Sequence, residues 1–511
     1  MKILDCTLRD GGYYTNWDFD SKLVDSYFHN LNELPVDYLE IGYRSPCLSG
    51  YHGEFYYCPE FLLKKIASIS KKKLVIILNE KDIVIDEVKQ LLKPCIGVIT
   101  MVRIAIDPSN LIRAIDLARK VKEMGFEIGF NVMYMSKWKE HNEFISNLKF
   151  VDEVADYFYM VDSYGGVYPN DVREIYALVR QYVKAKIGFH GHNNMELALI
   201  NSLTAIECGV EIVDSTITGM GRGAGNLKTE LLLTALNQKD NLEVNFNSLS
   251  AVTDVFSELQ KHHEWGTNLP YMVSGANSLP QKDVMDWVGK RYYSYNSIIR
   301  ALQNQSKGQK DNERLPIFDL KTNEKVALIV GGGNSVIEHS DSIREFLLLN
   351  QNTIVIHASS KNAIVFNELS NTQIFCLVGN EGHRMEDVFK EKVPKNVTCV
   401  LPPFPRKMGT YIPINLKSNS FELSKNTFTS SFVDSHTAIA LQTVLDLNVE
   451  HVFLVGYDGY NSQALDEKAQ DLLNENRILF ERFITIFSGE FVSLTPTVYP
   501  ISVSSIYARL S

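Results

Sequence analysis

Eight short apolar segments alternate with amphipathic segments across residues 1–240, and this alternation constrains the fold more than any other feature. The segments predicted as strands are Lys2–Leu8, Tyr38–Tyr43, Lys73–Asn79, Gly97–Ile104, Glu127–Tyr134, Tyr157–Ser163, Lys186–His192 and Glu211–Ile217. Between them apolar residues recur at three- and four-residue steps, as in 109–124, which is typical of helices. Alternating strands and helices pair as a parallel sheet with crossover helices. Eight such units predict an α/β fold with a closed (β/α)8 TIM barrel, and an open doubly wound sheet is the alternative.

The rest of the chain is predicted to form three further parts. Residues 241–300 continue with helical periodicity and are predicted as a helical cap on the barrel. The polar segment 301–325 is predicted as a linker. At Val326 a second alternation of strands and helices begins, which predicts a Rossmann-like α/β domain over 326–511.

The composition is that of an ordinary globular chain of 511 residues, 45% hydrophobic and 22% charged. The formal net charge of −10 gives no basic footprint for nucleic-acid binding. The N-terminus lacks the apolar core of a signal peptide, and no apolar run is long enough to span a membrane. Seven scattered cysteines without CxxC spacing argue against a disulfide framework or a structural zinc site. We therefore expect a reduced, cytoplasmic protein with no membrane span and no nucleic-acid partner.

Polar side chains gather where the predicted barrel strands end, the edge at which such barrels hold their active sites. His190 and His192 are two residues apart on a strand, so their side chains point to one face. In a closed barrel the eighth strand lies between the seventh and the first, so Asp10 and Asn226 share the sector of this histidine pair. Imidazole, carboxylate and amide ligands suit Mn²⁺ or Mg²⁺, with Zn²⁺ as an alternative. These four residues are the predicted metal site, although an HxH pair alone can be structural.

Two neighbouring features leave alternatives open. Arg9 either forms a rim salt bridge with Asp10 or acts as a fixed cation that stabilises an enolate oxygen. The glycine-rich run 219–226 is either a tight loop or a stretch of backbone that a bound ligand can approach closely.

Three motifs, at the ends of the first, seventh and eighth strands, carry a resemblance to a known family. They are Leu-Arg-Asp-Gly-Gly at 8–12, His-Gly-His-Asn-Asn at 190–194 and Gly-Met-Gly-Arg-Gly-Ala-Gly-Asn at 219–226. With them, residues 1–300 resemble the DRE-TIM metallolyase superfamily, which includes HMG-CoA lyase and isopropylmalate synthase. The resemblance is closest to the 4-hydroxy-2-oxovalerate aldolase branch. Asp162 and Ser163 match a further motif of that family at the end of the sixth strand.

The resemblance implies a metal-dependent lyase, an aldolase that makes or breaks a carbon–carbon bond next to a 2-oxo acid. Its small-molecule partners would be a 2-oxo acid, as pyruvate enolate, and an aldehyde. It implies that Asp10, His190 and His192 bind the metal and that Asn226 is a weaker ligand. Arg9 would stabilise the enolate.

One position departs from the aldolase branch, which carries a histidine as general acid/base three residues after the metal-binding aspartate. This sequence has Tyr13 there. A tyrosine with an ordinary pKa of about 10 is a weaker base at neutral pH, although a nearby metal and Arg9 can lower that pKa. His52, which also fits an ordinary surface-loop histidine, and a metal-bound water are the other candidates for the base. The substrate is therefore expected to differ from that of the ordinary aldolase.

The second domain carries a resemblance of its own. The run Gly331–Ser335 joins a predicted strand to a helix, a junction that can hold a phosphate, although tight packing alone also explains it. Together with the segments 435–441 and 452–458, it resembles a bacterial sialyltransferase or motility-accessory-factor type glycosyltransferase domain. The resemblance implies a nucleotide or nucleotide-sugar site, and the residues concerned are Gly332, Asn334, Ser335, His436 and Asp458. His436 would be a base or a plain helix-start residue, and Asp458 would orient a ribose or hydroxyl.

Three functions stay open at this point. The first is a bifunctional enzyme, in which a metal aldolase is fused to a nucleotide-sugar-handling domain that serves surface-carbohydrate synthesis. The second is a Claisen-type acyltransferase, isopropylmalate-synthase-like, that uses an acyl-CoA on the same barrel. In the third, the C-terminal domain is only a ligand-binding or assembly module. Assembly as a homo-oligomer is compatible with all three.

Overall fold

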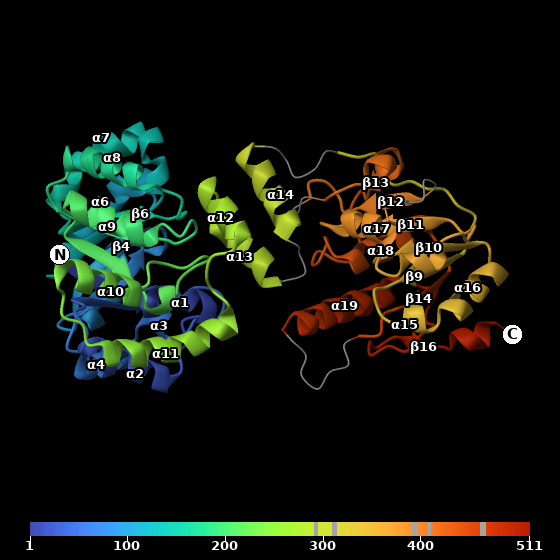
Figure 1. Cartoon of the computed structure of the whole chain (residues 1–511), viewed down its shortest axis with the longest axis horizontal. Helices are drawn as coiled ribbons and strands as arrows, with labels where there is room; N and C mark the ends of the chain where they lie inside the picture. The colour runs from blue at the N-terminus through green and yellow to red at the C-terminus, as the bar shows by residue number, and fades with distance from the viewer. Residues whose placement is uncertain (291–294, 309–313, 391–396, 407–409, 460–466, 511) are drawn as a thin grey trace. The chain divides into compact units, whose positions relative to one another are not determined.

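The computed structural model describes residues 1–290, 295–308, 314–390, 397–406, 410–459 and 467–510. The chain forms two compact units, Met1–Met285 and Asp286–Ser511 (Figure 1). Among the described residues, no helix combines the length and the apolar character that a membrane crossing requires. The seven cysteines, all of them described, are free thiols.

A closed barrel of eight parallel strands, in the order β1 to β8, forms the centre of the first unit. The strands are β1 (Lys2–Asp5), β2 (Tyr38–Tyr43), β3 (Lys73–Asn79), β4 (Ile99–Ile106), β5 (Glu127–Val132), β6 (Tyr157–Asp162), β7 (Lys186–Gly191) and β8 (Ile212–Ser215). β1 pairs with both β2 and β8, and the second pairing, with Leu4 opposite Asp214, closes the barrel. The predicted barrel is thus confirmed, and the open sheet is excluded for this unit.

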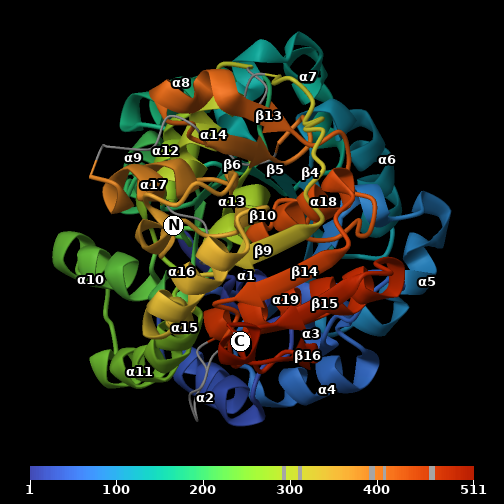
Figure 2. The same ribbon diagram turned by 90° about the vertical axis from the view of Figure 1, so that its right-hand side faces the viewer.

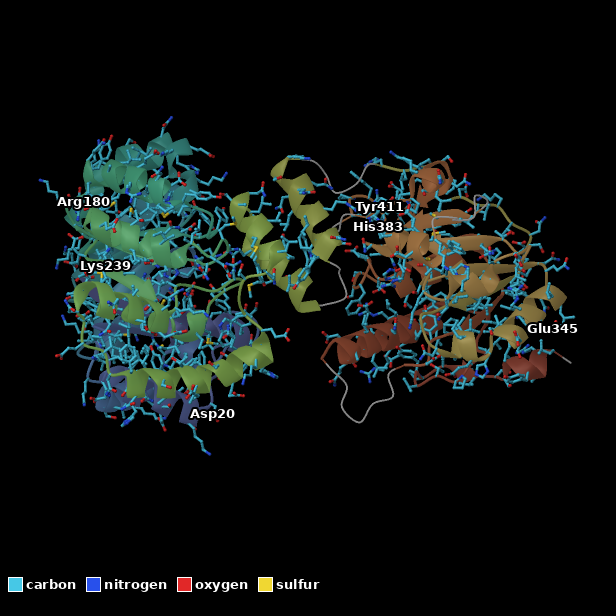
Figure 3. The ribbon with its side chains drawn as sticks, in the orientation of Figure 1. Asp20, Arg180, Lys239, Glu345, His383 and Tyr411 are labelled. Atoms are coloured by element: carbon cyan, nitrogen blue, oxygen red, sulfur yellow. The ribbon has the colours of Figure 1, made fainter. Side chains whose placement is uncertain are left out.

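Helices surround the barrel and follow its strands along the chain (Figure 1). They are α1 (Thr7–Thr15), α2 (Ser21–Asn32), α3 (Glu54–Tyr57), α4 (Glu60–Ile69), α5 (Val88–Leu92), α6 (Leu111–Lys122), α7 (Asn142–Asn147), α8 (Pro169–Arg180), α9 (Ala198–Cys208), α10 (Thr229–Asp240) and α11 (Phe246–His263). Two more helices follow along the chain, α12 (Leu269–Ala276) and α13 (Gln281–Lys290), and the boundary between the two units falls inside α13. Asp20, which is labelled in Figure 3, caps α2 because its carboxylate accepts hydrogen bonds from two backbone amides of the first turn. Arg180, at the end of α8, pairs with Glu211 and so links that helix to the start of β8.

The barrel interior changes from aromatic to charged along the strands, because residues two apart point to the same side. Tyr38 and Tyr157 fill the end where the strands begin, and their hydroxyls accept from the Lys2 ammonium. Two residues further along β2, Glu40 is fully buried. Arg103 on β4 is fully buried too, and its guanidinium lies 4.0 Å from the centre of the Tyr159 ring. The charged layer therefore lies toward the carboxyl ends of the strands.

The first strand is shorter than the sequence predicts, since it ends at Asp5 instead of Leu8. The chain turns there because the Asp5 carboxylate accepts from the backbone amide of Thr7, and helix α1 follows at once. Gly11 and Gly12 lie inside α1, where helix propensity disfavours glycine. A β-carbon added to Gly11 would lie 2.5 Å from the Met220 side chain. One added to Gly12 would lie 2.2 Å from the Trp17 side chain. Close packing therefore explains both glycines.

The second unit contains an eight-stranded parallel sheet in the order β13-β12-β11-β10-β9-β14-β15-β16. Its strands are β9 (Val326–Val330), β10 (Thr353–His357), β11 (Gln373–Cys376), β12 (Thr398–Leu401), β13 (Ser420–Glu422), β14 (His451–Val455), β15 (Glu490–Ser493) and β16 (Ser502–Val503). Its helices are α14 (Tyr295–Ser306), α15 (Ser335–Glu338), α16 (Ser340–Leu349), α17 (Glu381–Val388), α18 (His436–Leu447) and α19 (Glu467–Ile486). The predicted second parallel sheet is therefore present.

Both faces of this sheet are covered. Ile329 of β9 packs in one apolar cluster with α18 and α19, for example against Leu441 and Phe480. Its neighbour Leu328 packs in another cluster on the opposite face, with Phe346 of α16. Figure 2 shows β10, β9, β14, β15 and β16 following one another across the sheet. The strand order reverses between β9 and β14, the place at which ligand crevices form in sheets of this kind.

Helix α14 extends into the first part of the segment 301–325 that the sequence predicts as a linker. It is held by its apolar face, since Ile298 and Leu302 are fully buried. Arg300 of the same helix lies 3.2 Å from the imidazole of His383, whose ring stacks on that of Tyr411. Both of these residues are labelled in Figure 3.

Candidate active site

Arg9 and Asp10 lie in the first turn of α1, directly beyond the carboxyl end of β1. Both are buried. The Arg9 guanidinium contacts the Asp10 carboxylate and also donates from Nε to Glu40 Oε2 at 2.6 Å. The rim salt bridge expected of Arg9 therefore exists. One nitrogen of the group, Nη2, is buried without a hydrogen-bond partner among the described residues and can still donate to a ligand.

The histidine pair offers two free ring nitrogens. His190 Nδ1 lies 2.8 Å from Asp214 Oδ2, which leaves Nε2 of this ring 3.7 Å from Asp10 Oδ2. His192 Nδ1 lies 2.8 Å from the backbone carbonyl of Asp162. The two ring centres are 4.9 Å apart. Histidines that bind metals usually hold a carboxylate or carbonyl with the other nitrogen, and both rings here have that arrangement.

Asn226 joins this group because its backbone forms a β-bridge with that of His192. Its amide nitrogen donates to Asp10 Oδ2 at 2.7 Å. Its amide oxygen is buried and has no hydrogen-bond partner in the described part of the chain. The structure thus brings the four residues of the predicted metal site together, and the orphaned oxygen is one that a cation would satisfy.

Three further buried residues complete a closed circuit of charges with Arg9, Asp10 and His190. Glu40 accepts from Arg9, and its Oε2 lies 3.3 Å from Arg103 Nη1. Arg103 Nη2 donates at 2.5 Å to Asp214 Oδ2, which also holds His190. Three carboxylates and two guanidiniums make up this circuit, so it has one negative charge in excess while the imidazole is neutral. We call these six residues the charge ring.

The electrostatics of the charge ring suit a cation. Burial lowers the pKa of His190 well below its usual value, and it lowers the pKa of His192 as well. Both imidazoles are therefore neutral, the form that binds a metal ion. Burial pushes the pKa of Asp10 upward, but the Arg9 guanidinium and the hydrogen bond from Asn226 hold that pKa below its ordinary value. Two neutral nitrogens, a carboxylate and an amide oxygen fit a divalent cation.

A second set of donor atoms lies beside this one, because Cys6, His190 and Asp214 offer ligand atoms within 4.8 Å of one another. Burial raises the pKa of the Cys6 thiol well above its usual value, and a protonated thiol is a poor metal ligand. Asp214 Oδ2 is already engaged by both Arg103 and His190. This set is therefore better suited to supporting the ligands than to replacing them.

Both residues predicted as the general base lie in one aromatic cluster at the barrel mouth. Tyr13 is one turn after Arg9 on α1, and its hydroxyl lies 3.3 Å from that of Tyr43. Its ring centre is 5.1 Å from that of Trp17. His52 lies on another side of the same indole, 5.9 Å away, and stacks on Tyr56. Of the two, Tyr13 shares its helix with Arg9 and Asp10.

The motif at the end of β6 and the glycine-rich run are both held by local contacts. Asp162 accepts from the backbone amide of Gly166, and Ser163 Oγ accepts from that of Tyr134. In the glycine-rich run, a β-carbon on Gly221 would lie 2.6 Å from the Asn226 amide nitrogen. The run is therefore a tight loop packed on the metal-site asparagine.

Sequence reasoning missed Glu40, Arg103 and Asp214. A usable signal was present, because each is a lone charged residue at an inward-facing position of a strand that is otherwise apolar. Tyr38, Met101 and Ile212, two residues earlier on the same strands, face the barrel interior. Buried charges of this kind require partners, so three of them on different strands of one barrel indicate a network.

The second unit has a cleft of 720 Å³ at the carboxyl ends of its strands, beside the reversal of strand order. Gly332, Asn334, His436 and Asp458, all predicted for a ligand site, line it. Ser335 does not line it, and its backbone amide and hydroxyl both donate to Asp458. The Asp458 carboxylate thus occupies the turn between β9 and α15 where the sequence suggests a phosphate.

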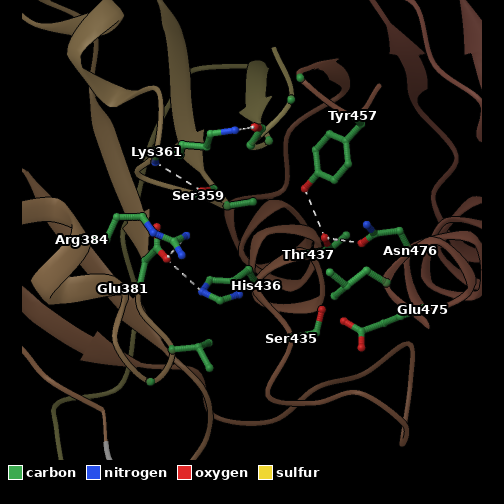
Figure 4. Close-up of a pocket in the computed structure, with 18 of the residues that line it drawn as sticks. Ser359, Lys361, Glu381, Arg384, Ser435, His436, Thr437, Tyr457, Glu475 and Asn476 are labelled. Carbon is green, nitrogen blue, oxygen red and sulfur yellow. Dashed lines mark hydrogen bonds and ion pairs between the residues drawn. The ribbon is translucent and has the colours of Figure 1, made fainter. Parts of the chain in front are cut away.

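Cationic groups gather on one side of this cleft (Figure 4). His436 Nε2 lies 3.4 Å from Oε2 of Glu381, a buried carboxylate that also binds Arg384. Lys361 donates to the Gly332 carbonyl at 3.1 Å. On another side, Tyr457 and Asn476 meet at the Thr437 hydroxyl. The cleft therefore presents cationic and neutral polar groups from different loops, together with five carboxylates, those of Glu381, Asp387, Asp434, Asp458 and Glu475.

Comparison with known proteins identifies the first unit. Residues 1–256, half of the chain, match the family model described as HMGL-like. The chain is 30% identical over 240 residues to a 4-hydroxy-2-oxovalerate aldolase of Geobacillus thermodenitrificans, a match that covers 46% of this chain and 69% of the relative. A 4-hydroxy-2-oxovalerate aldolase of Bacillus cereus is also 30% identical, over 256 residues, 47% of this chain and 70% of the relative.

A crystal structure of the N-terminal domain of a candidate aldolase from Bacteroides vulgatus is similar as well. It has 58% sequence identity and a TM-score of 0.57, and the match covers 59% of this chain and all of that domain. The resemblance of the barrel to the metallolyase aldolases is thereby confirmed over the matched region. The chain belongs to the HMGL-like family.

Proposed function

We propose that the barrel is a divalent-metal-dependent aldolase that joins or separates pyruvate enolate and an aldehyde. The observation that carries this proposal is the meeting of Asp10, His190, His192 and Asn226, whose amide oxygen is buried without a partner among the described residues. The excess negative charge of the charge ring supports a cation there. The names of the two curated relatives support the reaction class.

Asp10, His190 and His192 would hold the cation, with Asn226 as a weaker ligand. Mn²⁺ or Mg²⁺ suits this oxygen-containing set, and Zn²⁺ is the alternative. When bound, such an ion supplies Lewis-acid polarisation of the oxygens of a 2-oxo acid.

The chain's own residues supply the remaining chemistry. In the cleavage direction, a base removes the proton of the 4-hydroxyl, the C3–C4 bond breaks to give the aldehyde, and its electron pair forms the pyruvate enolate. A proton added to C3 then gives pyruvate. Arg9 Nη2, buried and without a partner among the described residues, would donate to the enolate oxygen as negative charge develops.

Tyr13 is the proposed acid/base, and His52 the alternative. The Tyr13 hydroxyl has the Tyr43 hydroxyl at 3.3 Å as a neighbour that can pass on a proton. Burial raises the pKa of Tyr43 well above its usual value, so that neighbour stays protonated. A substitution of Tyr13 by Phe removes the hydroxyl while keeping the ring that packs on Trp17.

Exchange of the pyruvate methyl protons for deuterium, followed by NMR with Mg²⁺, tests the metal site without an aldehyde. We expect exchange in the wild type and a loss of about 1000-fold or more in Asp10→Asn, because Lewis-acid stabilisation is worth several kcal/mol. Asp240→Asn, at an exposed position, is the control. Equal exchange in wild type and Asp10→Asn would contradict the proposal. If carbon–carbon bond formation instead requires an acyl-CoA and releases free thiol, the Claisen-type alternative is correct.

The second unit is a separate candidate. We propose that it is a Rossmann-like domain that binds a nucleotide or nucleotide-sugar, possessing a glycosyltransferase-like site that acts in surface-carbohydrate synthesis. The observation that favours this is the cleft at the reversal of strand order, with the cations Lys361 and Arg384 on one side. His436, held by Glu381, would be the base of that site.

Calorimetric titration of the full chain with CMP, UDP and GDP and their sugars tests this second proposal. We expect one class to bind, and Arg384→Gln to weaken that binding about 10-fold, the effect of losing one charge-assisted contact. Arg344→Gln, on α16 and outside the residues that line the cleft, is the matched control. Binding without any transfer activity would leave a ligand-binding or assembly module. If none of these nucleotides and nucleotide-sugars binds, the nucleotide proposal is wrong.

A further inference from the structure

Arg222 differs from the other arginines of the first unit. That unit has eight arginines, and the other seven each contact a carboxylate or a backbone carbonyl. Arg222 is half-buried in the glycine-rich run, and no carboxylate of the described residues lies within ion-pair distance of its guanidinium. Its recorded contact is with an aromatic ring, since the guanidinium carbon lies 5.5 Å from the centre of the Tyr13 ring.

The backbone around Arg222 is fixed at several points. The Tyr14 hydroxyl donates to the carbonyl of Gly223 at 3.0 Å. The amide of Gly225 donates to the carbonyl of Arg222, and the amide of Asn193 donates to that of Gly225. An arginine whose neighbours are held in this way is positioned before a ligand arrives, which lowers the cost of binding.

The contact of Arg222 with Tyr13 relates it to the aldehyde more than to the 2-oxo acid. Arg9, beside Asp10, already offers a free donor next to the metal-site residues. Arg222 lies over the ring of Tyr13, and its charge also reaches His192. The aldehyde oxygen must lie within reach of the group that exchanges its proton. If that group is Tyr13, substituents of the aldehyde lie beside Arg222.

We propose that Arg222 binds an anionic group, a carboxylate or a phosphate, carried by the aldehyde substrate and thereby selects aldehydes of that class. This inference rests on the proposed aldolase function of the barrel. A guanidinium matches both groups because its donors form a planar fork.

Matched aldehydes test this selectivity with the full chain, Mg²⁺ and pyruvate. Butanal is compared with succinic semialdehyde, and glyceraldehyde with glyceraldehyde 3-phosphate, so that the two arms separate a carboxylate from a phosphate. We expect the wild type to prefer a charged member. Arg222→Gln should lower kcat/KM for that member about 10- to 100-fold, the usual worth of one charge-assisted contact, and change the neutral one less than about twofold. Arg222→Lys should be intermediate because it retains the charge without the fork.

Two measurements keep the outcomes apart. Deuterium exchange into pyruvate needs no aldehyde and should be unchanged in Arg222→Gln. Calorimetry compares the affinity for glycerol 3-phosphate with that for glycerol, neither of which can react. If phosphate is the recognised group, glycerol 3-phosphate should bind more tightly. Arg119→Gln, on the outer helix α6, is the matched control and should alter none of these values.

Loss of exchange in Arg222→Gln, or an equal loss for charged and neutral aldehydes, would overturn the inference, because Arg222 would then serve the 2-oxo acid or the fold. Exchange in the wild type without any preference for charged aldehydes would overturn the inference alone. Absence of exchange in the wild type would overturn the proposed function, and the inference with it.

Discussion

The barrel mouth and the cleft of the second unit both collect charged side chains at the carboxyl ends of parallel strands, yet they hold them differently. In the barrel, Arg103 and Asp214 are wholly buried, and their charges are paired across the interior. In the cleft, the side chain of Arg384 is 54% exposed although its partner Glu381 is buried. The barrel site is thus preorganised around a few unpaired atoms, whereas the cleft leaves its cations accessible to water and to a larger ligand.

This difference has an energetic consequence. Buried charges are costly unless partners compensate them, so removal of one member of the charge ring exposes the others to that cost. Exposed pairs are worth little to the fold, commonly below about 1 kcal/mol. Substitutions in the charge ring should therefore affect stability, and substitutions of the exposed cations of the cleft should mainly affect ligand binding.

The largest effect is expected for Arg103→Met. The substitution leaves Glu40 and Asp214 buried without the guanidinium that lies between them. We expect a loss of about 3–5 kcal/mol in the free energy of unfolding, measured by urea denaturation of the full chain. Arg119→Met, which removes an exposed arginine paired with Glu153, should cost less than about 1 kcal/mol.

A second substitution tests the cause of that loss. Adding Asp214→Asn to Arg103→Met removes one uncompensated carboxylate and should recover part of the lost stability, because replacing both members of a buried pair is often tolerated. If the double variant is less stable than Arg103→Met alone, the packing of Arg103 on Tyr159 dominates and the charge ring does not explain the effect.

The contrast between the two regions also explains what the sequence could predict. The strand–helix alternation predicts the barrel, since β2 and β3 occupy the predicted residues. Asp10, His190, His192 and Asn226 could be brought to one sector because strand order in a closed barrel is fixed by connectivity. These residues could be predicted because the two-residue period of a strand and their place at its end are both read from the local sequence.

Other features depend on partners that are distant in the sequence. Glu40, Arg103 and Asp214 come from three strands, and only the closed barrel shows that they compensate one another. The helix α1 was missed because Gly11 and Gly12 disfavour a helix, and their close packing on Met220 and Trp17 is visible only in three dimensions. Asp458, after β14, likewise contacts Ser335, which follows the neighbouring strand β9 but is distant in the sequence, a pairing that no local pattern indicates.

An intermediate effect is expected on acidification, from the buried carboxylate of the cleft. Burial pushes the pKa of Glu381 upward, but the His436 imidazole 3.4 Å away, the charge of Arg384 and the Ser360 hydroxyl lower it to about 2. Because this pKa is lower in the folded state, the carboxylate stabilises the fold above pH 4.5, its ordinary pKa, and that contribution is lost as the pH falls toward 2. It is at most about 3 kcal/mol.

Unfolding curves at several pH values measure this contribution. Glu381→Gln should be less stable than the wild type near neutral pH, and the difference should shrink between pH 4.5 and 2. Glu345→Gln, at an exposed position labelled in Figure 3, is the control and should leave the pH dependence unchanged. A constant difference across this range would show that the Glu381 charge does not stabilise the folded state.

The smallest effect on stability, and the sharpest test of the contrast, is expected for Lys361→Met. Lys361 is exposed and its ammonium donates only to the Gly332 carbonyl in the described structure, so the free energy of unfolding should change by less than about 0.5 kcal/mol. Its ammonium faces the cleft as a point charge, so affinity for a phosphorylated ligand should fall, and more at low than at high salt. Lys321→Met, outside the cleft, should change neither quantity. If Lys361→Met destabilises the fold while leaving nucleotide affinity and its salt dependence intact, then the cations of the cleft serve the structure as those of the barrel do, and the distinction between the two regions fails.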